Sequence, residues 1–205
     1  SNAKLGLEII VPEGIQAHHL NFETLKTMKH AGLTRFTIGA ESGVQRVLDD
    51  VINKGGLTVE KIEQVVCDAV KLGMAPSCFF VIGIVGETLA EAEQTVAFAQ
   101  KMRKLGAANC NVRNAIPMPG TRMQEIAREK GYLLVPPEQL EDFDFVHEGR
   151  HLMKTPEWTP EQIETLVSKA QIQNLQHISR FKNLILHPRS TLKLRMKLSK
   201  MKQFA

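Results

Sequence analysis

The chain has 205 residues, of which 43% are hydrophobic and 23% are charged, and its formal net charge is +4. This composition is typical of a folded globular domain and excludes a disordered chain. No apolar run reaches the roughly 18 residues that a membrane-spanning helix needs. Three cysteines without a C-x-x-C pair argue against a disulfide framework and favour free thiols in a reducing cytoplasm.

Strand and helix signals alternate over the first 130 residues. Residues 7–14 (LEIIVPEG) are predicted as a strand, and a helix capped by Asn21 follows. Residues 34–43 (TRFTIGAESG) are predicted as the second strand, with the helical segment VQRVLDDVINK after it. Thr58 begins a further helix over residues 58–73.

The alternation continues with two more strands. Residues 77–87 (SCFFVIGIVGE) and 109–121 (NCNVRNAIPMPGT) are predicted as strands, and helices follow at 88–106 and 122–131. This order predicts parallel βα units with right-handed crossovers. The third strand is a continuous apolar run, which is typical of a sheet covered on both faces.

The pattern changes after residue 133, so we divide the chain into segments 4–133 and 134–205. The second segment begins irregularly, and a helix is predicted from Thr159 to about His187, where Pro188 interrupts it. The segment STLKLRMKLSKMK after it fits a helix better than a strand. Nine basic residues and no acidic residue lie between Thr165 and Ala205, so the C-terminal tail is basic.

The carboxyl ends of parallel strands meet at one edge of a sheet, where ligands bind. The second predicted strand ends at Glu41 and Ser42, a carboxylate and a hydroxyl that suit the diol of a ribose. The third ends at Gly83 and Gly86, which leave room for a flat ring beside the main chain. Because no P-loop lysine is present, these ends predict a nucleoside site rather than a bare phosphate site.

Three segments resemble the second part of a radical S-adenosylmethionine (radical SAM) catalytic domain. They are LTRFTIGAESGVQRVLDDVINKG, FFVIGIVGET and NAIPMPGTRMQEIAREKGYL. The resemblance covers residues 5–133 and is nearest to the cobalamin-linked group of that superfamily. It implies an α/β fold, a partial TIM-type barrel of about four parallel strands (the third to sixth of the barrel), followed by a helical C-terminal extension.

The resemblance also implies cofactors. Enzymes of this family use a [4Fe-4S] cluster to cleave S-adenosylmethionine, and the resulting 5′-deoxyadenosyl radical abstracts hydrogen from a small-molecule substrate; some also bind cobalamin. Carried over by position, the cofactor-contacting residues are Glu41 and Ser42 near the ribose, Ile82, Gly83 and Gly86 near the adenine, and Ile116 and Pro117 on the sixth barrel strand. The resemblance assigns no catalytic residue and no metal ligand to this chain.

The C-x-x-x-C-x-x-C motif that binds the cluster in this family is absent from the chain. We therefore interpret the chain as a truncated piece, inactive alone, whose cluster-binding N-terminal half is its missing partner. An unpaired sheet edge would favour dimers. The basic tail is either a solvated helix face or a contact with an acidic partner, namely a weak contact with an anionic membrane or a contact with the rest of the parent enzyme.

The sequence leaves other interpretations open. The main alternative is a complete small α/β nucleotide-binding domain unrelated to radical chemistry. A nucleic-acid-binding module is disfavoured, because the basic tail has no interleaved aromatics beyond Phe181 and Phe204. The adjacent residues His18 and His19 are interpreted as solvated. Metal binding by His147 and His151 is disfavoured, because Gly149 between them weakens the helix that would align them. Trp158 is interpreted as a packing residue.

Overall fold

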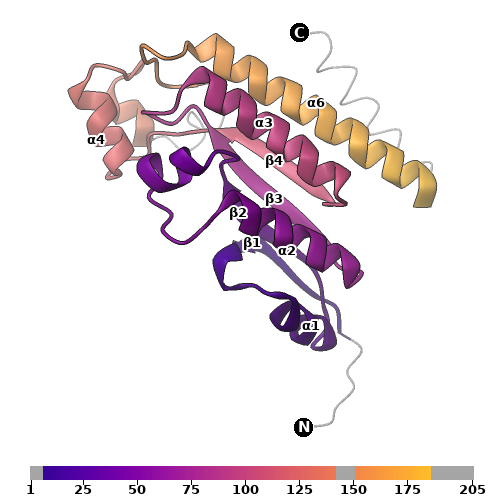
Figure 1. Ribbon diagram of the computed structural model, residues 1–205. Helices are drawn as coiled ribbons and strands as arrows, with labels where there is room; N and C mark the ends of the chain where they lie inside the picture. The colour runs from indigo at the N-terminus through magenta and orange to yellow at the C-terminus, as the bar shows by residue number, and fades with distance from the viewer. Residues whose placement is uncertain (1–6, 142–150, 186–205) are drawn as a thin grey trace.

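The computed structural model describes residues 7–141 and 151–185, with side chains to residue 175. Four parallel strands form one sheet in the order β1-β2-β3-β4 (Figure 1). Their bounds are β1 Ile9–Ile15, β2 Leu33–Glu41, β3 Ala75–Ile82 and β4 Asn109–Asn114. The expected α/β fold of four parallel strands joined by helices is confirmed, although β3 and β4 end earlier than the sequence pattern predicted.

In the described ranges, five α-helices connect or flank the strands: α1 Phe22–His30, α2 Val59–Lys71, α3 Leu89–Lys104, α4 Arg122–Glu129 and α6 Pro160–Ile185. Side-chain caps set where several of them begin, because the first backbone N–H groups of a helix lack internal partners. Asn21 Oδ1 accepts a hydrogen bond from Thr24 N at 2.9 Å, as its position predicted. Thr88 and Glu91 form a reciprocal capping box at the start of α3.

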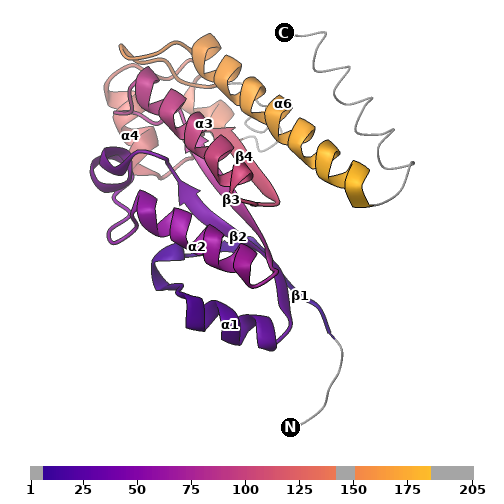
Figure 2. The ribbon, with the colours of Figure 1, turned by 45° about the vertical axis from the view of Figure 1, so that its right-hand side comes forward.

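Helices α1, α2 and α3 lie along one face of the sheet (Figures 1 and 2). Alternate strand residues, among them Phe36, Ile38, Phe80 and Ile82, are at most 2% exposed on that face. The residues between them are mostly half-buried. The expectation that both faces are covered is therefore corrected for the described residues, since the second face of β3 forms the wall of an open cavity.

The predicted helix over VQRVLDDVINK is shorter and wider than expected. A π-helical turn, η2 (Val47–Val51), replaces most of it, and Ile52 N donates to Val47 O at 2.9 Å. Asn53 then takes a left-handed backbone with φ 57°, which ends the turn. The side chain of Gln45 bonds to Leu57 O and Val59 N, so contacts with the next connection shape this segment.

Helix α6 packs along α3 and the outer edge of β4 (Figure 2). Cys110 N on that edge donates to Asn174 Oδ1 at 3.1 Å, and Arg103 Nη1 donates to Ala170 O at 3.2 Å. Trp158 is 2% exposed and belongs to the same hydrophobic core as the sheet residues, so its interpretation as a packing residue is confirmed. The first turns of the C-terminal extension thus share one core with the sheet.

The opposite edge strand, β1, carries exposed apolar side chains. Ile9 is 42% exposed and Ile10 is 45% exposed. The described part of the chain also contains two short 3-10 helices, η1 (Ala17–His19) and η3 (Pro137–Glu141). No helix in the described ranges is long and apolar enough to span a bilayer. The predicted helix over STLKLRMKLSKMK lies outside the described residues.

Candidate functional site

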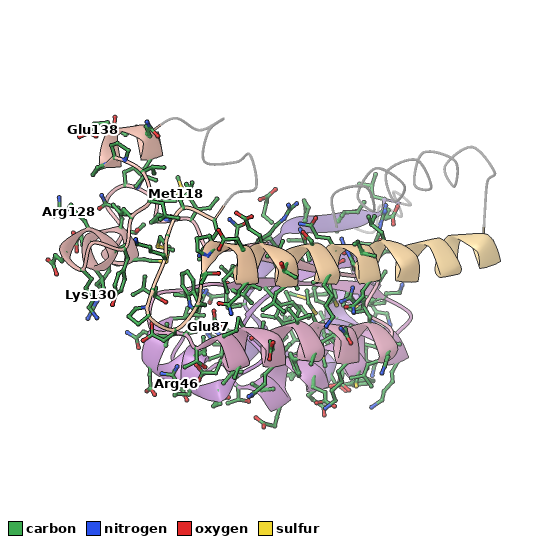
Figure 3. All side chains as sticks on the ribbon, turned by 90° about the horizontal axis from the view of Figure 1, so that it is seen from above. Arg46, Glu87, Met118, Arg128, Lys130 and Glu138 are labelled. Carbon is green, nitrogen blue, oxygen red and sulfur yellow. The ribbon has the colours of Figure 1, made fainter. Side chains whose placement is uncertain are left out.

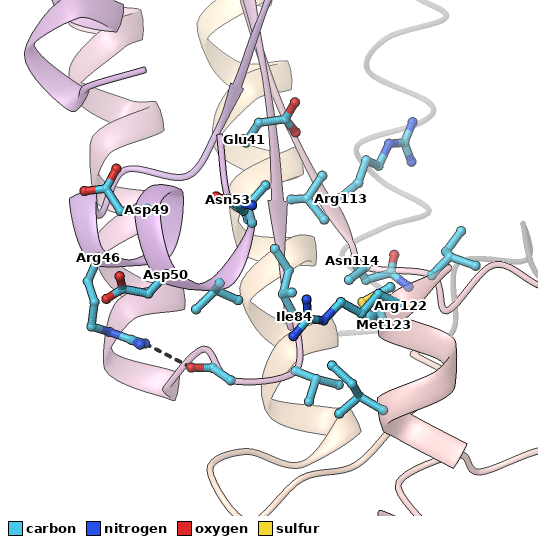
Figure 4. A pocket seen from close by; sticks show the side chains of 18 of the residues that line it. Glu41, Arg46, Asp49, Asp50, Asn53, Ile84, Arg113, Asn114, Arg122 and Met123 are labelled. Atoms are coloured by element: carbon cyan, nitrogen blue, oxygen red, sulfur yellow. Dashed lines mark hydrogen bonds between the residues drawn. The ribbon is translucent and has the colours of Figure 1, made fainter. Parts of the chain in front are cut away.

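A cavity of about 1280 Å³ opens at the carboxyl ends of β2, β3 and β4 (Figure 4). This is large enough for a cofactor and part of a second ligand, because pockets for single drug-sized ligands measure roughly 300–1,000 Å³. All three strand ends contribute to its lining, which includes Glu41, Val81, Ile84, Gly86, Arg113 and Ile116.

Glu41 brings a carboxylate into this cavity from the end of β2. Its backbone is left-handed with φ 61°, a conformation that costs a non-glycine residue about 1–3 kcal/mol. A register shift between Gly39 and Glu41 marks the same point. Lys54 Nζ lies 3.0 Å from Glu41 Oε1, so one carboxylate oxygen is ion-paired. A carboxylate has several acceptor positions, so Glu41 can still accept hydrogen bonds from a diol.

Ser42 follows Glu41 in the chain but points elsewhere. It is fully buried, and its hydroxyl lies 3.0 Å from Thr95 Oγ1 on α3. The Ser42 hydroxyl also accepts a hydrogen bond from Val44 N at 3.1 Å. The structure therefore places Ser42 as a support of the β2–η2 connection, and it does not bring this hydroxyl into the cavity.

The turn after β3 is held by its own glutamate. Glu87 Oε2 accepts hydrogen bonds from Gly83 N at 2.7 Å and from Ile84 N at 3.2 Å. Gly83 has φ 75°, and a Cβ there would lie 2.7 Å from His151 Cε1, so a side chain does not fit. Gly83 consequently faces His151, whereas Ile84, Val85 and Gly86 line the cavity.

Glu87 and His151 are both buried beneath this turn, at 0% and 3% exposure. Burial raises the pKa of Glu87 to about 7 and lowers the pKa of His151 to about 4. Glu87 Oε1 and both ring nitrogens of His151 have no hydrogen-bond partner among the residues described. The His151 ring packs edge-on against Trp158, whose Nε1 donates to Glu87 O at 3.0 Å. These contacts attach the turn to the C-terminal extension.

Arg46 supports the same turn from the η2 side. Its Nη2 donates to Gly86 O at 2.9 Å, the contact drawn as a dashed line in Figure 4. The guanidinium also makes two hydrogen bonds of 2.6 Å with the Glu91 carboxylate. This bidentate pair lowers the pKa of Glu91 to about 2. Figure 3 shows Arg46 and Glu87 near the same end of the molecule, where α3 begins.

The end of β4 completes the cavity. Ile116 lines it, whereas Pro117 is buried and is absent from its lining. Ile82 is fully buried on the helical face, and its carbonyl accepts a hydrogen bond from Ala115 N at 2.8 Å, joining the ends of β3 and β4. Of the seven residues assigned from the resemblance, Glu41, Gly86 and Ile116 line the cavity. The other four do not line it: Ser42, Ile82, Gly83 and Pro117.

Sequence reasoning missed three arginines that line the cavity: Arg46, Arg113 and Arg122. The strand period of two was a usable signal for Arg113, because Asn111 and Arg113 fall on the face of β4 opposite to Cys110 and Val112. In Figure 4, Arg122 reaches from the start of α4 toward Ile84. No comparable local signal identifies Arg46, whose partners are 40 and 45 residues away.

The three thiols are not arranged to hold a [4Fe-4S] cluster. Cys78 and Cys110 are register partners on β3 and β4, and both are buried on the helical face, opposite to the cavity. A hydrogen bond with Cys110 and burial raise the pKa of Cys78 well above its usual value. Cys67 lies apart on α2. A cluster needs three convergent thiolates, and these residues do not fit it.

The described histidines do not belong to a cluster of metal ligands. No group of three or more potential metal ligands occurs in the described part of the chain. His151 lies against Trp158 in the core, and His147 lies outside the described residues. His18 is half-buried and His19 is exposed on η1.

Comparisons with known proteins agree with this geometry. Residues 9–99 match the family described as the Radical SAM superfamily. An uncharacterized methyltransferase of Pyrococcus horikoshii is 33% identical over 168 residues, which are 82% of this chain and 34% of that protein. Cytidylyl-2-hydroxyethylphosphonate methyltransferase of Streptomyces wedmorensis is 29% identical over 142 residues, covering 66% of this chain and 26% of that enzyme. The chain thus spans about a third of the first relative and about a quarter of the second.

Two solved structures share the fold. The radical SAM methyltransferase TsrM from Kitasatospora setae, with tryptophan and a SAM analogue bound, aligns with a TM-score of 0.57 and 18% identity. That alignment covers 81% of this chain and 37% of TsrM. Coproporphyrinogen III oxidase (HemN) of Escherichia coli aligns with a TM-score of 0.53 and 14% identity, over 84% of this chain and 32% of HemN.

Proposed function

Because residues 9–99 of this chain belong to the radical SAM superfamily, we propose that the cavity binds the adenosyl part of S-adenosylmethionine. The observation that carries this proposal is that Glu41, Ile84 and Ile116, from three neighbouring strand ends, line one cavity. These groups suit a nucleoside. A carboxylate accepts hydrogen bonds from the ribose diol, and apolar side chains beside a glycine turn give the base a flat contact surface.

Each residue has a defined part in this proposal. Glu41 accepts hydrogen bonds from the ribose hydroxyls, while Ile84 and Ile116 flank the adenine. Gly86 leaves its backbone accessible to the base, and Arg46 fixes that backbone through the carbonyl of Gly86. When bound together with a cluster, S-adenosylmethionine supplies the 5′-deoxyadenosyl radical. The contribution of this chain is to bind and orient the nucleoside.

We further propose that the whole protein is a methyltransferase. Both curated relatives named above are methyltransferases, and the chain covers 34% and 26% of them. The resemblance to the cobalamin-linked group supports cobalamin as a second cofactor of the whole protein. Because the three cysteines present do not converge, the thiolates of a cluster must be others, and we expect the 205-residue chain alone to be inactive.

The remaining proposals concern location and partners. Free thiols support a cytoplasmic location. The exposed apolar side chains of β1 support pairing of this edge with the cluster-binding part of the protein or with a second copy. An anionic membrane contact through the basic tail stays a proposal, because most of that tail lies outside the described residues.

Binding of S-adenosylhomocysteine to the chain, measured by calorimetry, tests the adenosyl assignment. We expect Glu41→Gln to weaken binding about tenfold, since a hydrogen bond to a charged group contributes roughly 1.5–3 kcal/mol. Glu23→Gln, an exposed glutamate on α1, is the matched control and should bind like the unmodified chain. 2′,3′-Dideoxyadenosine should bind the unmodified chain and the Glu41→Gln variant equally. Equal affinity of both proteins for S-adenosylhomocysteine would show that Glu41 does not contribute to binding.

A further inference from the structure

The β4 side of the cavity is polar, whereas its β3 side is apolar. Asn111 and Arg113 line the cavity from β4, and Phe79 and Val81 line it from β3. The register pairs Phe79 with Asn111 and Val81 with Arg113, so the two walls are formed by neighbouring strands on the same face of the sheet. Interior positions of a packed barrel are dominated by bulky apolar residues, and Asn111 and Arg113 depart from that pattern.

No described residue forms an ion pair with Arg113. Its side chain is exposed. Two other charged residues of the lining are already paired, since Glu41 contacts Lys54 and Arg46 contacts Glu91. Among the described residues, an incoming anion can therefore reach the guanidinium of Arg113, like that of Arg122, without displacing an ion-paired carboxylate.

The position of Arg113 separates it from the ribose contact. Glu41 is on β2 and Arg113 is on β4, with β3 between them. Two strand spacings correspond to about 10 Å. Figure 4 shows the guanidinium of Arg113 directed away from the Glu41 carboxylate. A group bound at Arg113 therefore lies beside the nucleoside and not on its diol.

We propose that Arg113, assisted by the amide of Asn111, binds an anionic group of the substrate that accepts the methyl group. A guanidinium presents paired N–H donors that fit a carboxylate or a phosphoryl group, and the shared chemistry is that of a small oxyanion. The proposal rests on the proposed function, because it takes the adenosyl position beside Glu41 as given. Arg113 then determines which substrates enter, through the charge that they carry.

The first test uses methylphosphonate and acetate as probes. Their dissociation constants are measured by NMR titration of the chain saturated with 5′-methylthioadenosine, which has no carboxylate of its own. We expect Arg113→Gln to weaken binding of either probe at least tenfold and Arg113→Lys to weaken it less. Arg128→Gln is the matched control, since Arg128 is on α4 and is absent from the cavity lining. Figure 3 shows Arg128 well apart from Arg46 and Glu87. Equal binding by Arg113→Gln, or no binding by the unmodified chain, overturns the proposal.

The second test separates the substrate from the cofactor, because the methionine part of S-adenosylmethionine also carries a carboxylate. If Arg113→Gln weakens binding of S-adenosylhomocysteine but not of 5′-methylthioadenosine, Arg113 binds the cofactor and the substrate assignment is wrong. We expect equal affinities of the two proteins for both nucleosides. If 5′-methylthioadenosine does not bind, the adenosyl site is refuted but the anion subsite is not. Binding of methylphosphonate that depends on Arg113 in the absence of nucleoside would still support the anion subsite.

Discussion

At the scale of single residues, the ion pair between Glu41 and Lys54 is the feature nearest to the proposed chemistry. Glu41 and Asn53 are the two non-glycine residues in the described ranges with a positive φ. One precedes η2 and the other follows it, so the turn brings Lys54 back to Glu41, with 3.0 Å between Nζ and Oε1. Lys54 therefore pairs with one of the two carboxylate oxygens that could accept hydrogen bonds from a ribose diol.

Lys54→Met should strengthen binding of 5′-methylthioadenosine about two- to fivefold. The Lys54 side chain is 41% exposed, and a pair of this kind contributes at most about 1 kcal/mol. Removing it frees both carboxylate oxygens for the diol. Lys71→Met, which removes an exposed lysine paired with Asp68 on α2, is the control and should leave the affinity unchanged. Weaker binding by Lys54→Met would show that the lysine positions Glu41 instead of competing with the ligand.

At the scale of elements, the turn after β3 depends on a buried carboxyl group. Glu87 Oε2 accepts from two backbone N–H groups, and burial nevertheless raises the pKa of Glu87 to about 7. In the unfolded chain this pKa returns toward 4.5. The folded state thus holds the proton more tightly, so the contribution of Glu87 to stability is complete below pH 4.5 and is lost as the pH rises to about 7.

Glu87→Gln should flatten the dependence of stability on pH between 5 and 8. Glutamine keeps an oxygen for Gly83 N and cannot ionise, so at pH 8 the variant avoids a loss on the order of 3 kcal/mol. Urea unfolding followed by the fluorescence of Trp158, the single tryptophan, measures the difference.

The buried imidazole of His151 is common to both proteins, so its own pH dependence cancels in this comparison. Its pKa is lowered to about 4, and its contribution is therefore lost as the pH falls below 6.5. Glu91→Gln serves as a contrast, because the pKa of Glu91 is lowered to about 2 and this carboxylate stays ionised from pH 5 to 8. Parallel pH profiles of Glu87→Gln and the unmodified chain would contradict the ionisation of Glu87 in this range.

At the scale of the whole molecule, the C-terminal extension joins the sheet at two places. Asn174 on α6 accepts a hydrogen bond from the edge of β4, and Trp158 donates one to the carbonyl of Glu87. The second contact reaches the turn that lines the cavity. The segment after residue 150 therefore helps to hold the turn of the candidate site in place. The alternation of strands and helices in the sequence did not indicate this role.

Local chemistry explains what the sequence could predict. Asn21 and Thr58 cap helices because a short polar side chain satisfies the free N–H groups just ahead of it, within three residues. Burial in β2 mostly alternates between the two faces, as the strand period of two predicts. In β3 the apolar run is continuous, so the sequence did not reveal that one of its faces lines a cavity. The resemblance carried the candidate site further and located Glu41, Gly86 and Ile116 in one cavity.

Contacts between distant parts of the chain explain the rest. Ser42 turns toward Thr95, 53 residues away, and so leaves the cavity. Gly83 faces His151, which a pattern in the turn itself does not reveal. The π-helical turn replaces a regular helix where Gln45 bonds to the connection before α2. Each outcome depends on a partner that only the folded chain brings near.

Intermolecular NMR contacts report directly whether the three strand ends bind an adenosyl group. With S-adenosylhomocysteine bound to the chain, we expect nuclear Overhauser effects from the adenine H2 and H8 protons to the side chains of Ile84 and Ile116. We also expect effects from the ribose protons to Glu41. Adenine contacts with α6 or β1 instead, or no contacts at a saturating ligand concentration, would contradict the adenosyl assignment.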